Sequence, residues 1–307
     1  MPKFLLAKGA RGELVRKVQM ALIELGFDPH GVDGAFGKNT ETAVTEFQQK
    51  LDLEPSGRVD HDTWTALLPL VQPPSIYERS LQLTAAFEGH GFSLAQGNWD
   101  GAGITWGIIG FTLKHGELGK VILQVFAESP SLVQESFGEH TDELVEILHS
   151  SKPVQMKFAN SISVGASKTA IKEPWKSAFK AFGEIPQVQA IQLQMADHDY
   201  GQPALETANA LELRSELGRA LAFDIHVQNG GIKSAARHEI ATALEDTPIT
   251  TEQERRVIVA HAVADASTSF QEDVRSRKLT IATGIGKVHG DTFVLSSWGL
   301  DETRADS

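Results

Sequence analysis

The stretch GNWDGAGITWGIIGFT, residues 97–112, combines five glycines with two tryptophans and one acid, Asp100, and ends in a nearly all-apolar run. A second acid, Glu88, lies a short way upstream in AAFEGHGF, residues 85–92. Cleavage of a glycosidic bond needs one carboxylic acid to protonate the leaving oxygen and one carboxylate to activate water or attack carbon. Two acids separated by a pliable loop meet that minimum, so this segment is the first candidate for a catalytic site.

The pattern around the two acids predicts a helical domain. IYERSLQLTAAFEG, residues 76–89, has apolar residues at helical spacing and a glycine stop, which places Glu88 in the last turn. Most segments from 117 to 274 repeat the 3.6-residue period, whereas ITWGIIGFT, residues 104–112, is predicted to be short and extended. TGIGKVHG, residues 283–290, lacks the Gly-Lys-Ser/Thr ending of a phosphate loop and is predicted to be a turn. The expected class is all-α or α-dominated, with at most a small β insert.

Composition narrows the possible functions. The length of 307 residues suggests two domains, and an apolar content of 41% is enough for real cores. The absence of cysteine excludes disulfides, a thiol nucleophile and cysteine-bound zinc. The formal net charge of −12 argues against nucleic acid or an anionic membrane as a partner, and it is compatible with a cationic or neutral polymer. None of the eleven histidines lies in an H-E-x-x-H pattern, so neither a metal nor a cofactor is expected.

Paired prolines in VQPPSIYE, residues 71–78, indicate the domain boundary, because they disfavour helix and stiffen the chain. We expect a small domain at 1–70, a linker at 71–75 and a large domain at 76–307. Three short helices are predicted in the small domain. The first spans 12–26. The second starts with Thr40 as N-cap after the turn GVDGAFGKNT, and the third lies in HDTWTALL with Asp62 or Thr63 as cap.

The small domain carries several motifs in a fixed order over residues 8–68, namely G-x-x-V-x-x-x-Q, DGAFGKNT, AV-x-x-FQ and TW-x-x-L. This order resembles the peptidoglycan-binding domain type 1, a three-helix wall-binding module. The resemblance implies binding of cell-wall glycan or stem peptide in a groove near Asp33 and Thr40. The plainer interpretation is that DG-x-FG serves only the left-handed geometry of a turn.

The pattern AFEG…WDGAGITWGIIGFTLKHGEL resembles the catalytic core of family 46 glycoside hydrolases, which are chitosanases with a lysozyme-like, two-lobed helical fold. The resemblance implies that Glu88 is the general acid, that Asp100 is the general base, and that Thr105 helps to hold the attacking water. It also implies an active cleft between the lobes, with Glu117 as a substrate-binding acid. The chain departs from the family pattern at Gly89, at Ala102 and in its shorter gap between the acids, which puts chitosan specificity in question.

The loop around Asp100 also offers substrate contacts. Trp99, together with Phe87 and Phe92, can supply apolar surroundings that disfavour the charged form of a carboxyl group. Gly101 and Gly103 would let a bulky sugar approach the backbone. Trp99, Gly101 and Gly103 are therefore predicted to bind substrate. The plainer interpretation is that Glu88 is a solvated helix end and that Asp100 caps a turn.

The favoured hypothesis is a peptidoglycan hydrolase, a glycosidase of the lysozyme or muramidase type that cuts the wall glycan with inversion. A wall-binding module concentrates an enzyme on a nearby substrate, which supports this choice. A chitosanase and a non-catalytic wall-binding protein are the alternatives. The expected partner is peptidoglycan or a related amino-sugar polymer, bound by a monomer with no membrane or nucleic acid involved.

The first residues, MPKFLLAKGARGEL, contain an apolar patch too short for a signal peptide. A wall hydrolase made in the cytoplasm without such a signal needs non-classical delivery, through phage lysis or contact-dependent secretion. We therefore expect a phage endolysin or an antibacterial effector. The pattern leaves two roles open for Asp197, Asp199 and Arg214, which either form a buried ion network or line the cleft.

Overall fold

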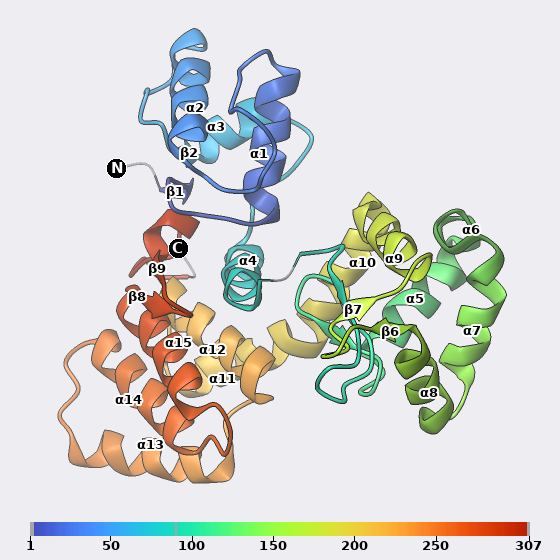
Figure 1. Ribbon diagram of the computed structural model, residues 1–307. Helices are drawn as coiled ribbons and strands as arrows, with labels where there is room; N and C mark the ends of the chain where they lie inside the picture. The colour runs from blue at the N-terminus through green and yellow to red at the C-terminus, as the bar shows by residue number, and fades with distance from the viewer. Residues whose placement is uncertain (1–2, 90, 306–307) are drawn as a thin grey trace. The chain divides into compact units, whose positions relative to one another are not determined.

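The computed structural model describes residues 3–89 and 91–305, and helices account for most of that part of the chain (Figure 1). Its strands form only small antiparallel sheets of two or three strands. The α-dominated class is confirmed. Among the described residues, no helix has both the length and the apolar character needed to cross a membrane.

The chain divides into two compact units. The first unit contains Met1–Phe87 and Asp199–Ser307, and the second contains Glu88–His198. The predicted wall-binding domain therefore shares a unit with the C-terminal third of the chain. A π-helical turn, η2 (Asp197–Gly201), carries the chain from the second unit back to the first.

The first unit begins with the three predicted helices, α1 (Glu13–Glu24), α2 (Lys38–Lys50) and α3 (His61–Leu67). Two short strands, β1 (Phe4–Leu6) and β2 (Val59–Asp60), pair beside them.

The caps of these helices differ from the prediction. The N-cap of α2 is Gly37, so Thr40 lies inside the first turn of α2 rather than before it. Asp60 caps α3 and accepts a hydrogen bond from the Thr63 N–H at 2.8 Å, so neither Asp62 nor Thr63 is the cap.

The rest of the first unit is a set of helices that ends in a β-hairpin. The helices are α4 (Ile76–Glu88), α11 (Gln202–Ala210), α12 (Glu216–Asn229), α13 (Ser234–Asp246), α14 (Glu252–Asp265) and α15 (Gln271–Thr283). The hairpin has strands β8 (Ile285–Val288) and β9 (Asp291–Val294), followed by the 3-10 turn η3 (Leu295–Trp298). Half of the segment predicted as a turn, residues 285–288, is thus strand, and the turn itself is His289–Gly290, both with positive φ.

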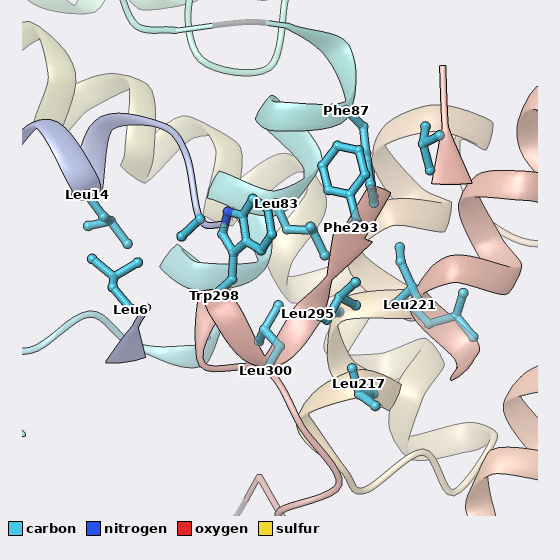
Figure 2. Packing of buried hydrophobic residues seen from close by; sticks show 14 of the residues in the cluster. Leu6, Leu14, Leu83, Phe87, Leu217, Leu221, Phe293, Leu295, Trp298 and Leu300 are labelled. Atoms are coloured by element: carbon cyan, nitrogen blue, oxygen red, sulfur yellow. The ribbon is translucent and has the colours of Figure 1, made fainter. Parts of the chain in front are cut away.

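One hydrophobic core runs through the first unit, and Figure 2 shows its central part. Phe87 of α4 packs edge-on against Phe293 of β9 at 4.7 Å between ring centroids, and Phe293 stacks on Trp298 at 5.6 Å. The indole N–H of Trp298 donates to the carbonyl of Arg11, just before α1, at 3.2 Å. The residues predicted to form the linker therefore join two parts that share a core. Labelled members in Figure 2 are Leu6, Leu14, Leu83, Phe87, Leu217, Leu221, Phe293, Leu295, Trp298 and Leu300.

The second unit packs helices around a small three-stranded sheet. The sheet contains β3 (Ala95–Gln96), β4 (Thr105–Trp106) and β5 (Phe111–Thr112) in that order, which confirms the predicted β insert. The helices are α5 (Glu117–Glu128), α6 (Pro130–Phe137), α7 (Thr141–His149), α8 (Lys152–Ile162), α9 (Trp175–Glu184) and α10 (Pro186–Ala196). A short 3-10 turn, η1 (Gly138–His140), joins α6 to α7, and the hairpin β6 (Ser163–Val164) and β7 (Ala170–Ile171) joins α8 to α9.

Buried contacts hold this sheet in place. Trp106 on β4 stacks on Phe182 at 5.5 Å, and its indole N–H donates to the carbonyl of Phe179 at 3.0 Å. Gln192 is fully buried, and its amide oxygen accepts from the Ile108 N–H at 3.0 Å while its amide nitrogen donates to the Phe92 carbonyl at 3.1 Å. The sheet and the loops beside it are thus fixed to α9 and α10.

Candidate active site

Glu88 ends α4, as predicted, and its side chain is exposed. Gly89 follows with φ +68, a left-handed conformation that ends the helix at low cost. Phe87 and Phe92, the predicted apolar neighbours, are themselves buried in the packing, each only 3% exposed. Both phenylalanines therefore contribute to the core of the protein, and the catalytic role of Glu88 stays a prediction.

Asp100 lies in the loop between β3 and β4, and its side chain is exposed. Its Oδ1 atom accepts a hydrogen bond from the Ala102 N–H at 2.9 Å, which forms a local turn. Asp100 therefore does stabilise a turn, as the plainer interpretation expected. One oxygen holding the turn fixes the carboxylate in place, which is also what a general base needs.

Asn98 holds this loop together, a role that the sequence analysis missed. Its amide oxygen accepts from the Gly103 N–H at 2.8 Å, and its backbone N–H donates to the Ser163 hydroxyl at 2.8 Å. The two ends of the segment around Asp100 are thus tied to each other and to β6. The only signal in the sequence is an asparagine two residues before the acid in a glycine-rich loop.

The other loop residues fall into two groups. Trp99 is 54% exposed, and a Cβ built on Gly101, which has φ +82, would meet no atom within 4 Å. Both are open to a ligand. Gly103 has φ +85, and a Cβ there would come within 3.1 Å of Leu113 and 3.3 Å of the Met156 sulfur. Internal packing is therefore enough to explain Gly103.

Thr105 and Glu117 lie on either side of β5. Thr105 is on β4, pairs in register with Gln96 and Thr112, and is buried to 8% exposure. A carboxylate oxygen of Glu117 accepts from the backbone N–H of Thr112 at 3.1 Å and from its hydroxyl at 3.2 Å. These contacts show that Glu117 holds the turn between β5 and α5, and its role toward substrate stays a prediction.

In the predicted wall-binding domain, Gln19 brings Asp33 and Thr40 together. Its amide nitrogen donates to the Asp33 carboxylate at 2.8 Å and to the Thr40 hydroxyl at 3.1 Å, and its amide oxygen accepts from the Gly34 N–H at 2.8 Å. Hydrogen bonds from Ala35 N–H and from Gln19 lower the pKa of Asp33. Asp33 is exposed, whereas Thr40 is 1% exposed. Thr40 therefore has a structural role in this turn, and its role toward a ligand stays a prediction.

A second glutamine repeats this arrangement. The amide nitrogen of Gln48 donates to the Thr63 hydroxyl at 3.0 Å, and its amide oxygen accepts from the Gly57 N–H at 2.9 Å. Each glutamine thus joins a glycine turn to a threonine in the first turn of the next helix. In the DG-x-FG motif, Gly34 has φ +74 and so provides the left-handed turn geometry, whereas the proposed ligand binding near Asp33 stays a prediction.

Among the residues that the structure describes, no three His, Asp or Glu side chains group closely enough to hold a metal ion. The three candidate acids lie on different elements: Glu88 on α4, Asp100 in the loop between β3 and β4, and Glu117 on α5.

Two family models match the chain. Residues 11–67 match the peptidoglycan binding domain family, and residues 86–256 match glycosyl hydrolase family 46. The second match contains Glu88, Asp100, Thr105 and Glu117, whereas the β8–β9 hairpin lies outside both.

Solved structures give the same fold. The native chitosanase from Bacillus subtilis MY002 is similar to this chain with a TM-score of 0.51 and 18% identity, over 74% of this chain and 97% of that one. A mutant chitosanase from the same source, complexed with 6 GlcN, has a TM-score of 0.50 and 18% identity, over 71% of this chain and 96% of that one. The predicted chitosanase-like fold is confirmed.

Proposed function

Because this chain belongs to glycosyl hydrolase family 46 and is therefore a glycoside hydrolase, we propose that it cleaves the amino-sugar backbone of bacterial peptidoglycan. The observation that carries the choice of substrate is the contact between the wall-binding domain and the helix that bears Glu88. The Glu13 N–H, at the start of α1, donates to the Gln82 side chain of α4 at 2.8 Å. A Cβ on Gly12 would come within 2.6 Å of the same Gln82 oxygen.

This contact supports the proposal because it joins wall binding to the candidate acid. Held against α4, the module keeps that helix close to whatever polymer it binds, and a high local concentration favours cleavage of that polymer. A module on a flexible linker would also raise the local concentration of polymer, but it would not hold that polymer near α4. Peptidoglycan is the polymer for which the matched family of residues 11–67 is described.

The proposed reaction is inverting hydrolysis by general acid and base. Glu88 donates its proton to the glycosidic oxygen as the bond from C1 to that oxygen breaks. Asp100 takes a proton from water as the water oxygen attacks C1 from the opposite face. Thr105 orients that water. The two carboxyl groups of an inverting enzyme stand about 6.5–9.5 Å apart, which leaves room for the water.

Trp99 and Gly101 complete the proposed site. An exposed indole offers an apolar face for the ring of a sugar, and the open backbone at Gly101 allows the sugar to approach. Asp100 lies between these two residues, so a sugar bound on them would lie against the proposed base.

A second candidate function is hydrolysis of chitosan. Its support is the fold, which is that of structures described as chitosanases, together with the net charge of −12, which attracts a polycation. Wall binding by residues 11–67 favours peptidoglycan over this alternative.

The deciding experiment measures release of reducing ends from purified sacculi, from chitosan and from chitin, followed by mass spectrometry of the products. We expect the wild type to release sugar-terminated fragments from sacculi, and Glu88→Gln to release none. Glu128→Gln is a matched control, because Glu128 is also an exposed acid at the last position of a helix. Cleavage of chitosan alone would favour the second candidate, and cleavage of none would leave a wall-binding protein without activity.

A further inference from the structure

Lysines gather in one segment of the second unit. Residues 152–180 contain six lysines and a single acid, Glu173, although the whole chain has a formal net charge of −12. The segment covers α8, the β6–β7 hairpin and most of α9. Such a local excess of positive charge favours an anionic ligand. All six side chains are exposed: Lys152, Lys157, Lys168, Lys172, Lys176 and Lys180.

The hairpin in this segment packs directly on the loop that carries Asp100. The Gly97 N–H donates to the carbonyl of Thr169 at 2.9 Å. A Cβ on Gly97 would come within 2.4 Å of the Lys168 carbonyl oxygen and 2.8 Å of that of Ala170, so only glycine fits there. Figure 1 shows β7 beside the teal segment that contains this loop. The hairpin and the loop therefore form one surface.

One lysine of the hairpin is directed toward this loop. Lys168 has φ +54, a conformation that few residues other than glycine adopt. Its ammonium group donates to the Asn160 side-chain oxygen at 2.9 Å, and the Asn98 amide nitrogen donates to that same oxygen at 3.0 Å. Lys168 and Asn98 thus donate to the same oxygen of Asn160, and Asn98 lies two residues before Asp100 in the sequence.

Within the part of the chain that the structure describes, the ammonium group of Lys168 forms no ion pair. Asn160 is a neutral amide, so it orients the ammonium group without neutralising it. Lys180, by contrast, forms an ion pair with Glu184 at 2.6 Å. A positive charge fixed on the oxygen that Asn98, two residues before Asp100, also contacts is suited to a carboxylate on the substrate.

We propose that Lys168, held by Asn160 beside Asn98, is an anion-binding subsite that accepts a carboxylate of the stem peptide on the wall glycan. This inference rests on the proposed function and adds a residue that discriminates between the two candidate polymers. Peptidoglycan carries free carboxylates on its stem peptides, whereas chitosan carries ammonium groups. Lys168 attracts the first and repels the second, so it selects peptidoglycan against chitosan.

The test compares Lys168→Gln with Lys180→Gln, which removes the same charge from the same unit. Three substrates are used: glycan with intact stem peptides, the same glycan stripped of peptides, and chitosan. For Lys168→Gln we expect about a tenfold lower kcat/KM on the peptide-bearing glycan through KM, no change on the stripped glycan, and a severalfold rise on chitosan. Lys180→Gln should match the wild type on all three, and added salt should narrow the difference.

A binding measurement separates this proposal from the proposed function. Calorimetry with a soluble disaccharide–peptide fragment compares the Glu88→Gln protein with the Glu88→Gln, Lys168→Gln double variant. Weaker binding by the double variant supports the subsite even if the wild type cleaves none of the polymers. Equal binding, or an equal effect of Lys168→Gln on all three substrates, would overturn it.

Discussion

Asp224 and Arg277 form a bidentate ion pair in the interior of the first unit. The Arg277 Nε atom lies 2.9 Å from Oδ1 and 3.0 Å from Oδ2 of Asp224, and Nη2 lies 2.7 Å from Oδ1. The Lys278 ammonium group donates to the same carboxylate at 2.6 Å, and the Thr84 hydroxyl of α4 donates to it at 2.9 Å. Asp224 therefore fixes the helix that ends in Glu88 to α12 and α15.

This ion pair makes stability depend on pH. Burial opposes ionisation of Asp224, but Arg277 and Lys278 outweigh it and lower the pKa of the carboxyl to about 2. Because the folded-state pKa lies below the unfolded value, the stabilisation is complete above about pH 4 and is lost as the pH falls toward 2. We expect a loss of about 2 kcal/mol over that range from this group. Denaturant titrations at a series of pH values measure it.

Asp224→Asn removes the buried negative charge to which both Arg277 and Lys278 donate. We expect it to destabilise the protein by about 3–5 kcal/mol at pH 7 and to flatten the stability change between pH 4 and 2. Asp246→Asn changes an exposed acid of the same unit and should shift stability by less than about 0.5 kcal/mol. An Asp224→Asn protein with the wild-type pH slope would contradict the argument.

His289 is expected to position Glu88 through the backbone. Its Nδ1 atom lies 3.1 Å from the Phe87 carbonyl oxygen, one residue before Glu88, and its Nε2 atom lies 2.5 Å from Asp273 Oδ1. A carbonyl oxygen only accepts, so Nδ1 carries the hydrogen in this contact. His289→Ala frees the end of α4 and should lower kcat by about ten- to hundredfold with little change in KM.

Two further variants separate positioning from simple loss of structure. His289→Asn places an amide nitrogen near the position of Nδ1 and should restore most of the rate. Lys287→Ala changes an exposed neighbour on β8 and should leave kcat unchanged. Equal kcat values for His289→Ala and the wild type, at equal melting temperature, would exclude this role.

Asn98 offers a similar test at the other acid. Asn98→Ala leaves the Gly103 N–H without its acceptor, so the loop around Asp100 loosens. We expect a loss of about 1–3 kcal/mol in stability and a clear fall in kcat. Asn160→Ala removes only the contact to the Asn98 amide nitrogen and to Lys168, so its effect on kcat should be smaller. A larger fall in kcat for Asn160→Ala than for Asn98→Ala would show that the Asn98 side chain is not what holds Gly103 in place.

The sequence predicted the elements whose signals are local. Helix α4 ends at Glu88 because Gly89 follows with positive φ, and α5 (Glu117–Glu128) forms where the predicted helical period begins, because its apolar spacing is regular. Thr40 was misplaced because the amide of Gln19, distant in sequence, draws its hydroxyl into the core. A cap assigned from propensity alone cannot account for such a contact.

The features that organise the site come from distant segments. Asn98, Asn160 and Lys168 meet at one oxygen, but they belong to a loop, a helix and a hairpin. The contact between Arg11 and Trp298 joins the start of the chain to its end. Periodicity indicates which face of an element is buried but not which residues cover it. Neither the contacts at Asn160 nor the contact between Arg11 and Trp298 could therefore be predicted.

The proposed acid and base should each be essential. Asp100→Asn keeps an oxygen that can accept from the Ala102 N–H, so the turn should survive while the base is lost. We expect kcat to fall by at least about 10²-fold for Asp100→Asn and for Glu88→Gln, with wall binding by residues 11–67 retained. Pull-down on sacculi and initial rates measure the two effects. Near-normal rates in either variant would remove that residue from the mechanism.

The stereochemistry of the first product distinguishes water activation from attack by a carboxylate. If Asp100 activates a water that Thr105 orients, each cleavage inverts the anomeric carbon, because the water enters from the face opposite the leaving group. Proton NMR recorded during the first minutes, before mutarotation, should therefore show the anomer opposite to that of the linkage. Thr105→Val keeps the shape of this buried side chain and loses its hydroxyl, so it should slow the reaction less than Asp100→Asn and keep the inverted product. A retained anomer would require two successive displacements at C1, through an intermediate on one acid or on the acetamido group of the substrate, and would exclude direct attack by a water that Asp100 activates.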